Sequence, residues 1–391
     1  MKKLNHISKA LLAIAMMLVV VFPSLAHDFE VDGIYYNYLD ETAKTVEVTY
    51  KGENVYSYSK EYIGSVTIPS SVLYNGTTYS ITSIGSHAFY DCRDLTSITI
   101  PNSVTTIGYD AFRSCGCLTS VTIPNSVTTI GSYAFYGTPW YNNQADGVIY
   151  VGKVLYNYKG TMPDNTSINI KEGIVSISPS AFGYCYGLTS IIVENGNNKY
   201  DSRDNCNAII KTSTNKLIAG CKNTVIPNFV TSIGSSAFYG CSGLTSITIP
   251  NSVTEIGENA FYGCSGLTSV NISDLSAWCK IDFVVSESNP LYYSNILNLN
   301  GIEIKDLAIP NDITEIKQYA FAGCSGLTSV TIPNSVTSIG SNAFSNCGLR
   351  LIMSHCVEPP VCNGEEFGGS DDSYRALLMI PEGDYDRLCS C

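Results

Sequence analysis

Short runs of alternating apolar and polar residues recur along most of the chain, always in the same order. One block reads LTSITIPNSVTTIGYDAFRSC at 95–115, and close copies lie at 244–264 and 327–347. In each block Leu, Ile and Val alternate with Thr and Ser until a Pro, which cannot continue a β-ladder. A run of this length, with period-2 alternation and many β-branched residues, predicts a short strand in every block.

The pair Ala-Phe occurs once in each block and marks the period of the repeat. Successive gaps between these phenylalanines are 23, 23, 47, 56, 23, 60 and 23 residues, so the base period is 23. The three long gaps read as two periods plus 1, 10 and 14 residues, which predicts about eleven coils. The phenylalanines, which we predict to be structural core residues, are Phe89, Phe112, Phe135, Phe182, Phe238, Phe261, Phe321 and Phe344.

The residues around each Phe keep their phase. Ile lies five positions before every one of these Phe residues, and Ala lies directly before it. Such uniformity predicts inward-facing positions that pack on their own copies in the coils above and below. Gly lies four positions before six of the eight, with Ser178 and Lys317 at the other two. Because Lys is costly in a left-handed backbone, we expect that Gly to serve close packing instead.

The segments outside the regular blocks suggest caps and insertions. We expect a hairpin cap at 27–62 with its turn near Asp40-Glu41, a solenoid over 63–350, and a closing cap or tail at 351–391, which may be incomplete. The three long gaps hold insertions near 136–180, 189–229 and 271–309, which we expect to form hairpins because they contain turn dipeptides such as Asn300-Gly301.

The first 26 residues are typical of a secretory signal peptide. Lys2, Lys3 and Lys9 precede an uncharged apolar run, and Ser24-Leu25-Ala26 supplies small residues at the cleavage positions. The alternative is a membrane anchor, but the run is shorter than the roughly 18–20 residues of a span. We therefore expect an exported protein, secreted or at the cell surface with the periplasm as an alternative, and without a membrane span after cleavage.

The repeat resembles the BspA-like class of leucine-rich repeats, whose pattern is L-x-x-I-x-I-P-x-x-V-x-x-I-G-x-x-A-F-x-x-C, over roughly residues 61–350. The resemblance implies a leucine-rich-repeat solenoid, a right-handed coil stack with a parallel β-sheet on one face and little helix. It also implies a bacterial exported or surface protein that binds or adheres to host or microbial macromolecules, with no catalysis.

Composition and charge narrow the function further. Only 14% of residues are charged, and 22 basic against 34 acidic residues give a net charge of −12, which argues against nucleic-acid binding. The chain has four His, and no phosphate loop, nucleophile elbow or paired metal-ligand motif occurs. We expect no enzyme activity, no metal, no cofactor, and a monomer.

Most cysteines follow the repeat. Seven of the fifteen lie three residues after a repeat Phe, and Thr138 takes that place once, which favours a ladder of small buried thiols. Cys206 and Cys221 differ, because they flank one candidate hairpin at equal distances from its tip at Ser213-Thr214. Their symmetry predicts a disulfide between Cys206 and Cys221, and the alternative is two free thiols.

The regular strands offer mainly Thr and Ser outward, which are poor binding anchors. The insertions carry both Trp residues of the chain, and insertions in a solenoid often form the binding face. We therefore predict ligand-binding aromatics at Trp140, Tyr141, Trp278, Tyr292 and Tyr293, for a protein or glycan on host or neighbouring cells. The alternative is that Trp140 and Trp278 are buried. A clustered, exposed aromatic patch would favour a binding protein, whereas hidden aromatics would favour a structural spacer without a ligand.

Overall fold

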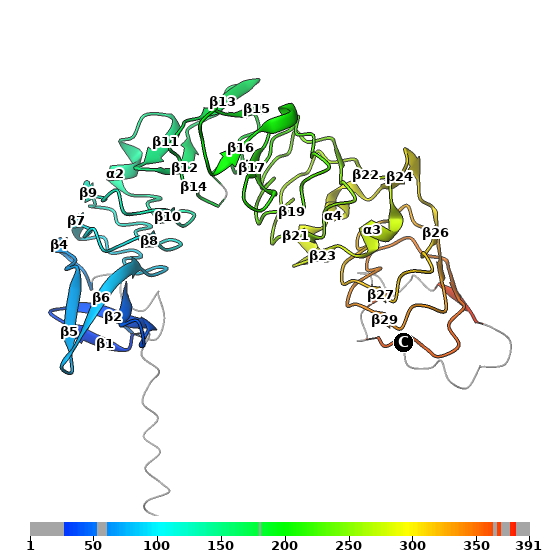
Figure 1. Ribbon diagram of the computed structural model, residues 1–391, viewed down its shortest axis with the longest axis horizontal. Coiled ribbons are helices and arrows are strands. Elements are labelled where there is room, and N and C mark those ends of the chain that lie inside the picture. Colours follow the sequence, from blue (N-terminus) through cyan, green and yellow to red (C-terminus); the bar gives the residue numbers. More distant parts are fainter. Residues whose placement is uncertain (1–26, 53–60, 180, 363–365, 369–375, 381–391) are drawn as a thin grey trace, which may run out of the picture. The chain divides into compact units, whose positions relative to one another are not determined.

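The computed structural model describes residues 27–52, 61–179, 181–362, 366–368 and 376–380 (Figure 1). The predicted signal peptide and parts of both predicted caps lie outside these residues. The chain forms two compact units, Met1–Asn143 and Gln144–Cys391, called unit 1 and unit 2 below. The sequence predicts one array over 63–350.

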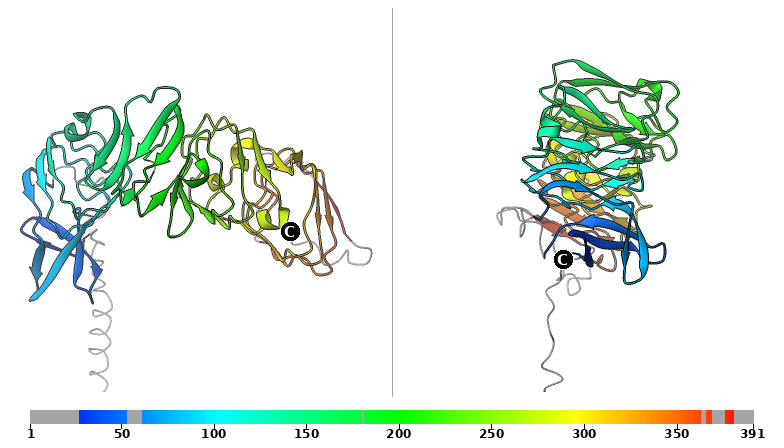
Figure 2. Two further views of the ribbon diagram at one scale, coloured as in Figure 1. Left: turned by 45° about the horizontal axis from the view of Figure 1, so that its top comes forward. Right: turned by 90° about the vertical axis from the view of Figure 1, so that its left-hand side faces the viewer.

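The protein is a β-solenoid with little helix, as the repeat predicts, and it has about 12 turns where the sequence predicts about eleven coils. Within each unit the strands of successive coils lie side by side (Figure 2). Each regular coil adds a strand to a parallel ladder, as β7 (Leu95–Thr99) does beside β9 (Ser120–Thr122). A second parallel ladder, which the sequence did not predict, runs through the two residues that end at the repeat Ile, as in β8 (Thr106–Ile107).

Unit 1 contains two sheets. The first has the order β1-β2-β3-β6-β8-β10 with β5 beside β6, and the second has the order β4-β7-β9. The hairpin of β2 and β3 joins the coils because β3 pairs parallel with β6. The remaining strands are β1 (Phe29–Val31), β2 (Ile34–Asp40), β3 (Thr45–Thr49), β4 (Gly64–Thr67), β5 (Ser71–Tyr74), β6 (Thr77–Ile84) and β10 (Thr129–Ile130).

Unit 2 contains the same two kinds of ladder, interrupted by hairpins. Its sheets have the orders β11-β12-β14, β13-β15, β16-β17-β18-β19-β21-β23, β20-β22-β24-β25, β26-β28-β30-β31 and β27-β29. The strands are β11 (Gly147–Val151), β12 (Val154–Lys159), β13 (Thr166–Ile170), β14 (Ser176–Ile177), β15 (Leu188–Val193), β16 (Tyr200–Asp201), β17 (Ile209–Lys211), β18 (Lys216–Ala219), β19 (Ser232–Ile233), β20 (Ser246–Thr248), β21 (Glu255–Ile256), β22 (Ser269–Ile272), β23 (Asp282–Phe283), β24 (Leu297–Leu299), β25 (Ile302–Glu303), β26 (Asp306–Ala308), β27 (Glu315–Ile316), β28 (Ser329–Ile332), β29 (Ser338–Ile339), β30 (Leu351–Ser354) and β31 (Leu377–Met379).

The described helices are short and lie between the regular blocks. Thr138 begins α2 by accepting a hydrogen bond from the Tyr141 N–H at 3.0 Å, as an N-cap residue does. These elements are α2 (Pro139–Asn142), α3 (Leu275–Cys279), α4 (Leu291–Ser294), and the 3₁₀ turns η1 (Arg203–Asn205) and η2 (Ser286–Ser288).

The core of each unit is a column of stacked phenylalanine rings. Phe89 and Phe112 lie 4.9 Å apart between centroids with 13° between ring planes, and Phe238 and Phe261 lie 5.0 Å apart at 6°. The backbone keeps this register, because the N–H of Phe112 donates to the Ala134 carbonyl of the next coil at 2.7 Å. The structure buries all eight repeat phenylalanines.

The stack extends one coil beyond the predicted repeats. Phe367 lies 23 residues after Phe344 and stacks on it at 5.2 Å and 3°. The N–H of Phe344 donates to the Glu366 carbonyl at 2.7 Å, as other repeat phenylalanines donate to an Ala carbonyl. The Ala-Phe pattern does not reveal this coil, because Glu366 stands where the other blocks have Ala.

Two residues with left-handed backbone flank the repeat Phe. We call the segment from four residues before the Phe to three residues after it the Phe turn. In unit 1, φ is positive two residues before Phe112, at Asp110 (53°), and two residues after it, at Ser114 (63°). The Gly four positions before Phe112 is not left-handed. A Cβ at Gly108 would lie 2.4 Å from the Ser86 backbone nitrogen, so that Gly permits close contact between coils.

We expect Phe261→Ala to lower the free energy of unfolding by about 3–5 kcal/mol, because it leaves a void inside the ring column. Phe261→Leu is the matched control and should cost less, because it refills most of that volume. Urea unfolding of the two variants and the parent measures this. An Ala variant as stable as the parent would contradict the packing role of the column.

Candidate functional site

The five aromatics predicted to bind ligand do not form one exposed group. Trp278 is buried at 1% exposure and Tyr141 at 8%, whereas Trp140 and Tyr293 are half-buried. Tyr292 alone among the five is exposed, at 48%. Most of these five aromatic side chains therefore pack against the protein itself.

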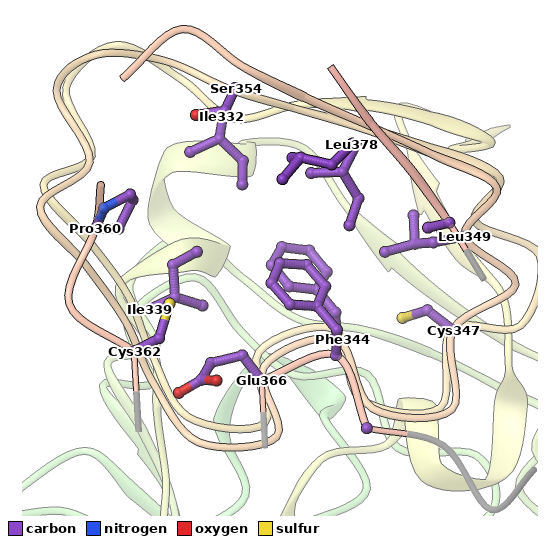
Figure 3. Close-up of a pocket in the computed structure, with 14 residues that line it drawn as sticks. Ile332, Ile339, Phe344, Cys347, Leu349, Ser354, Pro360, Cys362, Glu366 and Leu378 are labelled. Carbon is purple, nitrogen blue, oxygen red and sulfur yellow. The ribbon is translucent and has the colours of Figure 1, made fainter. Parts of the chain in front are cut away.

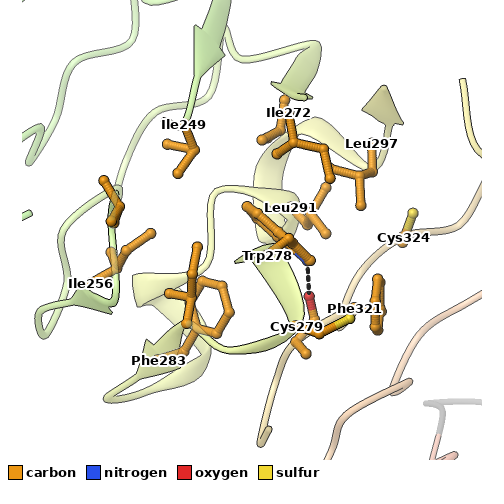
Figure 4. Close-up of a cluster of buried hydrophobic side chains, with 14 of the residues drawn as sticks. Ile249, Ile256, Ile272, Trp278, Cys279, Phe283, Leu291, Leu297, Phe321 and Cys324 are labelled. Carbon is orange, nitrogen blue, oxygen red and sulfur yellow. Dashed lines mark hydrogen bonds between the residues drawn. The ribbon is translucent and has the colours of Figure 1, made fainter. Parts of the chain in front are cut away.

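Trp278 is part of the core, and its prediction as a ligand-binding residue is wrong. Its indole Nε1–H donates to the Ala320 carbonyl at 3.0 Å, and its ring packs against Phe283 at 5.5 Å (Figure 4). In regular coils this Ala carbonyl accepts the backbone N–H of a Phe. Trp278 therefore supplies the aromatic ring and the hydrogen-bond donor that a repeat Phe supplies in a regular coil.

Tyr141 and Trp140 lie in α2, near the end of unit 1. The Trp140 ring lies 4.7 Å from Phe135, tilted by 51°, so it covers the last repeat Phe of that unit. Tyr141 is buried, which corrects its prediction as an exposed anchor. The helix start at Thr138 fixes both side chains, so they belong to the packing of α2.

Tyr292 and Tyr293 lie in α4 and meet other tyrosines. The Gly263 N–H donates to the Tyr293 hydroxyl at 2.8 Å, and burial raises the pKa of Tyr293. The two rings lie 5.0 Å apart in a T-shaped contact. This hydrogen bond places the pair beside Tyr262, the residue before Gly263.

Four tyrosines of the regular coils continue the same surface. Tyr184 contacts Tyr186 at 6.3 Å and Tyr239 at 5.2 Å, and its hydroxyl donates to the Tyr239 hydroxyl at 3.1 Å. Tyr239 stacks on Tyr262 at 5.2 Å with 17° between planes. We call the whole group the tyrosine strip: Tyr184, Tyr186, Tyr239, Tyr262, Tyr292 and Tyr293.

The Phe turn explains why these side chains point outward. Tyr239 and Tyr262 directly follow Phe238 and Phe261, and Tyr184 follows Phe182 by two positions with a φ of 61°. The left-handed residues reverse the chain around each buried Phe. This reversal leaves the side chains of the tyrosines that follow the Phe on the outside. Backbone bonds from Tyr184 N–H to the Tyr239 carbonyl and from Gly240 N–H to the Tyr262 carbonyl hold the register.

The strip has the composition of a binding surface. Its members Tyr184, Tyr186, Tyr262 and Tyr292 are 48%, 54%, 40% and 48% exposed. Tyrosine offers a large, rigid contact area with a hydroxyl at its tip, at low cost in side-chain entropy. The sequence signal was available, because Tyr directly follows the repeat Phe at four positions: Tyr90, Tyr136, Tyr239 and Tyr262.

Unit 1 carries a second group of exposed aromatics on its own Phe turns. Tyr109 and Tyr133 meet at 6.2 Å, and Tyr133 and Tyr136 meet at 6.0 Å, both in T-shaped contacts. The Arg113 guanidinium lies 5.7 Å from the centre of Tyr133 and 5.6 Å from that of Tyr136. We call Tyr109, Arg113, Tyr133 and Tyr136 the unit 1 patch.

A buried acid balances the charge of the unit 1 patch. Arg113 Nη1 donates to Asp110 Oδ2 at 3.0 Å, and His87 Nε2 lies 3.7 Å from the same oxygen. Asp110 is buried at 3% exposure, and its Oδ1 has no hydrogen-bond partner. The Asp110 carboxylate raises the pKa of Arg113 against the opposing effect of burial. The patch therefore presents aromatic area around a paired cation.

The repeat cysteines act as buried hydrogen-bond donors. Cys115 Sγ donates to the Phe89 carbonyl at 2.9 Å, and Cys264 Sγ donates to the Phe238 carbonyl at 3.2 Å. Burial raises the pKa of Cys92 to about 12, and it also raises that of Cys264. Because the thiolate is the reactive form, these side chains are poor nucleophiles at neutral pH.

Cys206 and Cys221 are free thiols, so the predicted disulfide is corrected. Near its tip the hairpin pairs Ile210 with Leu217, and this register would bring the two cysteines opposite each other. A bulge then shifts the pairing, so Ile209 faces Ala219. The extra residue destroys the symmetry on which the prediction depended, and Cys221 Sγ donates to the Asn207 carbonyl at 3.3 Å instead.

The C-terminal end of unit 2 holds a cavity of about 420 Å³ (Figure 3). Phe344, Ile339 and Leu378 contribute to an apolar lining, and Glu366 is the acidic residue in it. These side chains are the interior of the last coils, with Phe344 at the centre. The cavity therefore continues the core, and it brings together no group of catalytic side chains.

Two further observations concern the described residues. Among them, no three His, Cys, Asp or Glu side chains gather as a metal site would require. Within the same residues, no helix has both the length and the apolar character needed to cross a membrane.

The sequence itself identifies the family. The family model that describes the BspA type leucine-rich repeat region matches this sequence in six copies, over residues 47–146, 82–210, 209–282 and 294–355. These matches cover most of the chain, so the protein belongs to the BspA-type leucine-rich-repeat family. The comparison with curated proteins finds no match.

Several solved structures resemble the chain. A leucine-rich cell surface protein of Faecalibacterium prausnitzii is 24% identical over 83% of this chain and 94% of its own, with a TM-score of 0.37. A leucine-rich repeat protein of Eubacterium ventriosum is 20% identical over 89% and 96%, with a TM-score of 0.45. One of Bacteroides ovatus is 24% identical over 91% and 100%, with a TM-score of 0.30. Because these scores are low, we base the site on this chain's own geometry.

We expect Trp278→Ala to destabilise unit 2 by about 3–5 kcal/mol, because it removes a large buried ring. Trp278→Phe should cost less, since it restores most of the volume and Asn289 Nδ2 also donates to the Ala320 carbonyl, at 3.2 Å. Thermal unfolding of the two variants checks this order. Equal stability of Trp278→Ala and the parent would return Trp278 to the list of candidate binding residues.

We expect Cys264→Ser to be milder than Cys264→Val. The serine hydroxyl can still donate to the Phe238 carbonyl, whereas valine leaves that buried acceptor without the bond, at a cost of about 1–3 kcal/mol. Urea unfolding of both variants under reducing conditions measures the difference. If serine is the worse replacement, the thiol acts mainly as an apolar filler.

Proposed function

We propose that the protein is an exported binding protein that adheres to host or microbial macromolecules through non-covalent contacts. The observation that supports this most is the tyrosine strip, which joins four exposed phenols on one continuous surface of unit 2. Membership of a leucine-rich-repeat family agrees with recognition over an extended surface. The signal-peptide pattern of residues 1–26 supports export.

The strip is suited to binding because its side chains are already ordered. Tyr184 is fixed by Tyr186 on one side and by the hydroxyl contact with Tyr239 on the other. Little rotamer entropy remains to be lost when a partner arrives, so more of the contact energy contributes to affinity. Tyrosine is also among the residues that dominate interface energies.

The alternative function is a structural spacer with no ligand of its own. Such a protein would hide its aromatics in the core, as this chain does with Trp278 and the repeat phenylalanines. A spacer has no need for a row of tyrosines with four exposed members, which each add apolar surface to water. The exposed strip therefore favours the binding protein.

We expect Tyr184→Ala combined with Tyr262→Ala to weaken binding by about tenfold or more, because two interface anchors are lost. The measurement uses residues 27–391 against immobilised mucin and extracellular-matrix proteins, each purified and tested separately. The melting temperature should stay close to that of the parent, since both side chains are largely exposed.

The matched control is Leu39→Ala combined with Leu73→Ala, which removes two exposed apolar side chains outside the strip. It should leave binding unchanged. If the tyrosine variant binds every probe as the parent does, or loses stability and binding together, the spacer becomes the better explanation.

A further inference from the structure

Three tyrosines of the strip lie in a row at one spacing. The rings of Tyr239 and Tyr262 lie 5.2 Å apart in consecutive coils and are nearly parallel. Tyr184 lies at the same 5.2 Å from Tyr239, in a T-shaped contact at 81°. The strip thus repeats the phenol group at a spacing close to the roughly 4.8 Å between strands of a sheet.

The row consists of phenols and contains no charged side chain. A surface that selects an anionic ligand usually includes Arg or Lys, which bind carboxylate or phosphate directly. The unit 1 patch does include a cation, Arg113, but Asp110 already pairs with it. The composition of the strip therefore favours an uncharged ligand that offers apolar faces and hydroxyl groups.

A ligand that repeats can use a repeating surface fully. Each unit of the ligand meets a tyrosine at a similar spacing from the one before it, so contacts add along the strip. The surface of a folded protein does not repeat in this way. Neutral polysaccharides combine the three features, because their sugar rings repeat, carry C–H faces for aromatic contact, and carry hydroxyls that can bond to phenols.

We propose that the tyrosine strip binds a neutral glycan chain, laid along the direction in which the coils stack, with about one sugar ring for each tyrosine-bearing coil. This inference rests on the proposed binding function and specifies its ligand. A pyranose ring in an extended chain has about the length of one coil step, which lets neighbouring sugars meet Tyr184, Tyr239 and Tyr262 in turn.

The test is affinity gel electrophoresis of residues 27–391 in gels that contain one soluble polymer each. The neutral probes are mannan, xylan, glucan and galactan, the acidic probe is polygalacturonate, and the peptide probe is polyproline, which also packs on aromatic rows. We expect at least one neutral probe to retard the protein. The retardation should change little between low salt and roughly 0.5 M salt, because no charge is neutralised.

Variants and chain length then test the geometry. Tyr184→Ala combined with Tyr262→Ala should weaken binding to the neutral probe by about tenfold or more. Tyr109→Ala combined with Tyr136→Ala removes equally exposed tyrosines from the unit 1 patch, and it should leave that binding unchanged. Affinity for oligosaccharides of the retarding polymer should rise with length until the coils of the strip are covered.

Three results would overturn the inference. The first is retardation by polygalacturonate or polyproline but by no neutral probe. The second is neutral binding that the unit 1 variant abolishes and the strip variant does not. The third is no retardation by any probe. The proposed function would still hold if the strip variant loses mucin or matrix binding, and it would fail as well if that binding is also unaffected.

Discussion

Where two regular coils adjoin, the hydrogen bond from the N–H of one repeat Phe to the carbonyl before the next repeat Phe sets the spacing of the coils. It fixes the ring stack at 4.9–5.4 Å, as the Phe89–Phe112 and Phe321–Phe344 pairs show. At this spacing the backbones nearly touch, so Gly108, Gly131 and Gly340 have no room for a side chain. The left-handed residues on either side of the Phe close the turn around it. In the regular coils, the repeat is therefore a consequence of one contact made again from each coil to the next.

The insertions show how strongly this contact constrains the fold. Where a coil lacks the Phe, another donor satisfies the same acceptor. The Tyr158 N–H donates to Ala181, the Gly220 N–H donates to Ala237, and the Trp278 indole donates to Ala320. A buried carbonyl without a partner would cost free energy, so the insertions must supply one. The Trp278 indole shares this acceptor with Asn289 Nδ2, and the burial of Trp278 leaves it unavailable to a ligand.

The surface chemistry follows from the same turn. Because the chain reverses around each buried Phe, several of the side chains that follow it face outward, whereas the Ala directly before it is buried. Tyrosine occupies several of these positions, and the stacking of coils brings the copies together into the tyrosine strip and the unit 1 patch. The thiols three positions after the Phe face inward, where burial raises the pKa of Cys92 and its equivalents and keeps them unreactive. The fold thus keeps the unreactive thiols inside and places tyrosines outside, where they are suited to recognition.

The sequence by itself determined the period, the strands and the family, because each depends on residues within one 23-residue block. It missed the last coil, since Glu366 breaks the Ala-Phe pair although Phe367 keeps the period. The rest was decided by contacts between coils. A bulge at Ile209 moves Cys206 out of register with Cys221, and a bond to the Ala320 carbonyl and packing against Phe283 hold Trp278 inside. Tyr184 and Tyr239 are 55 residues apart and touch only because the insertion between them folds away, so the strip exists only in the tertiary structure.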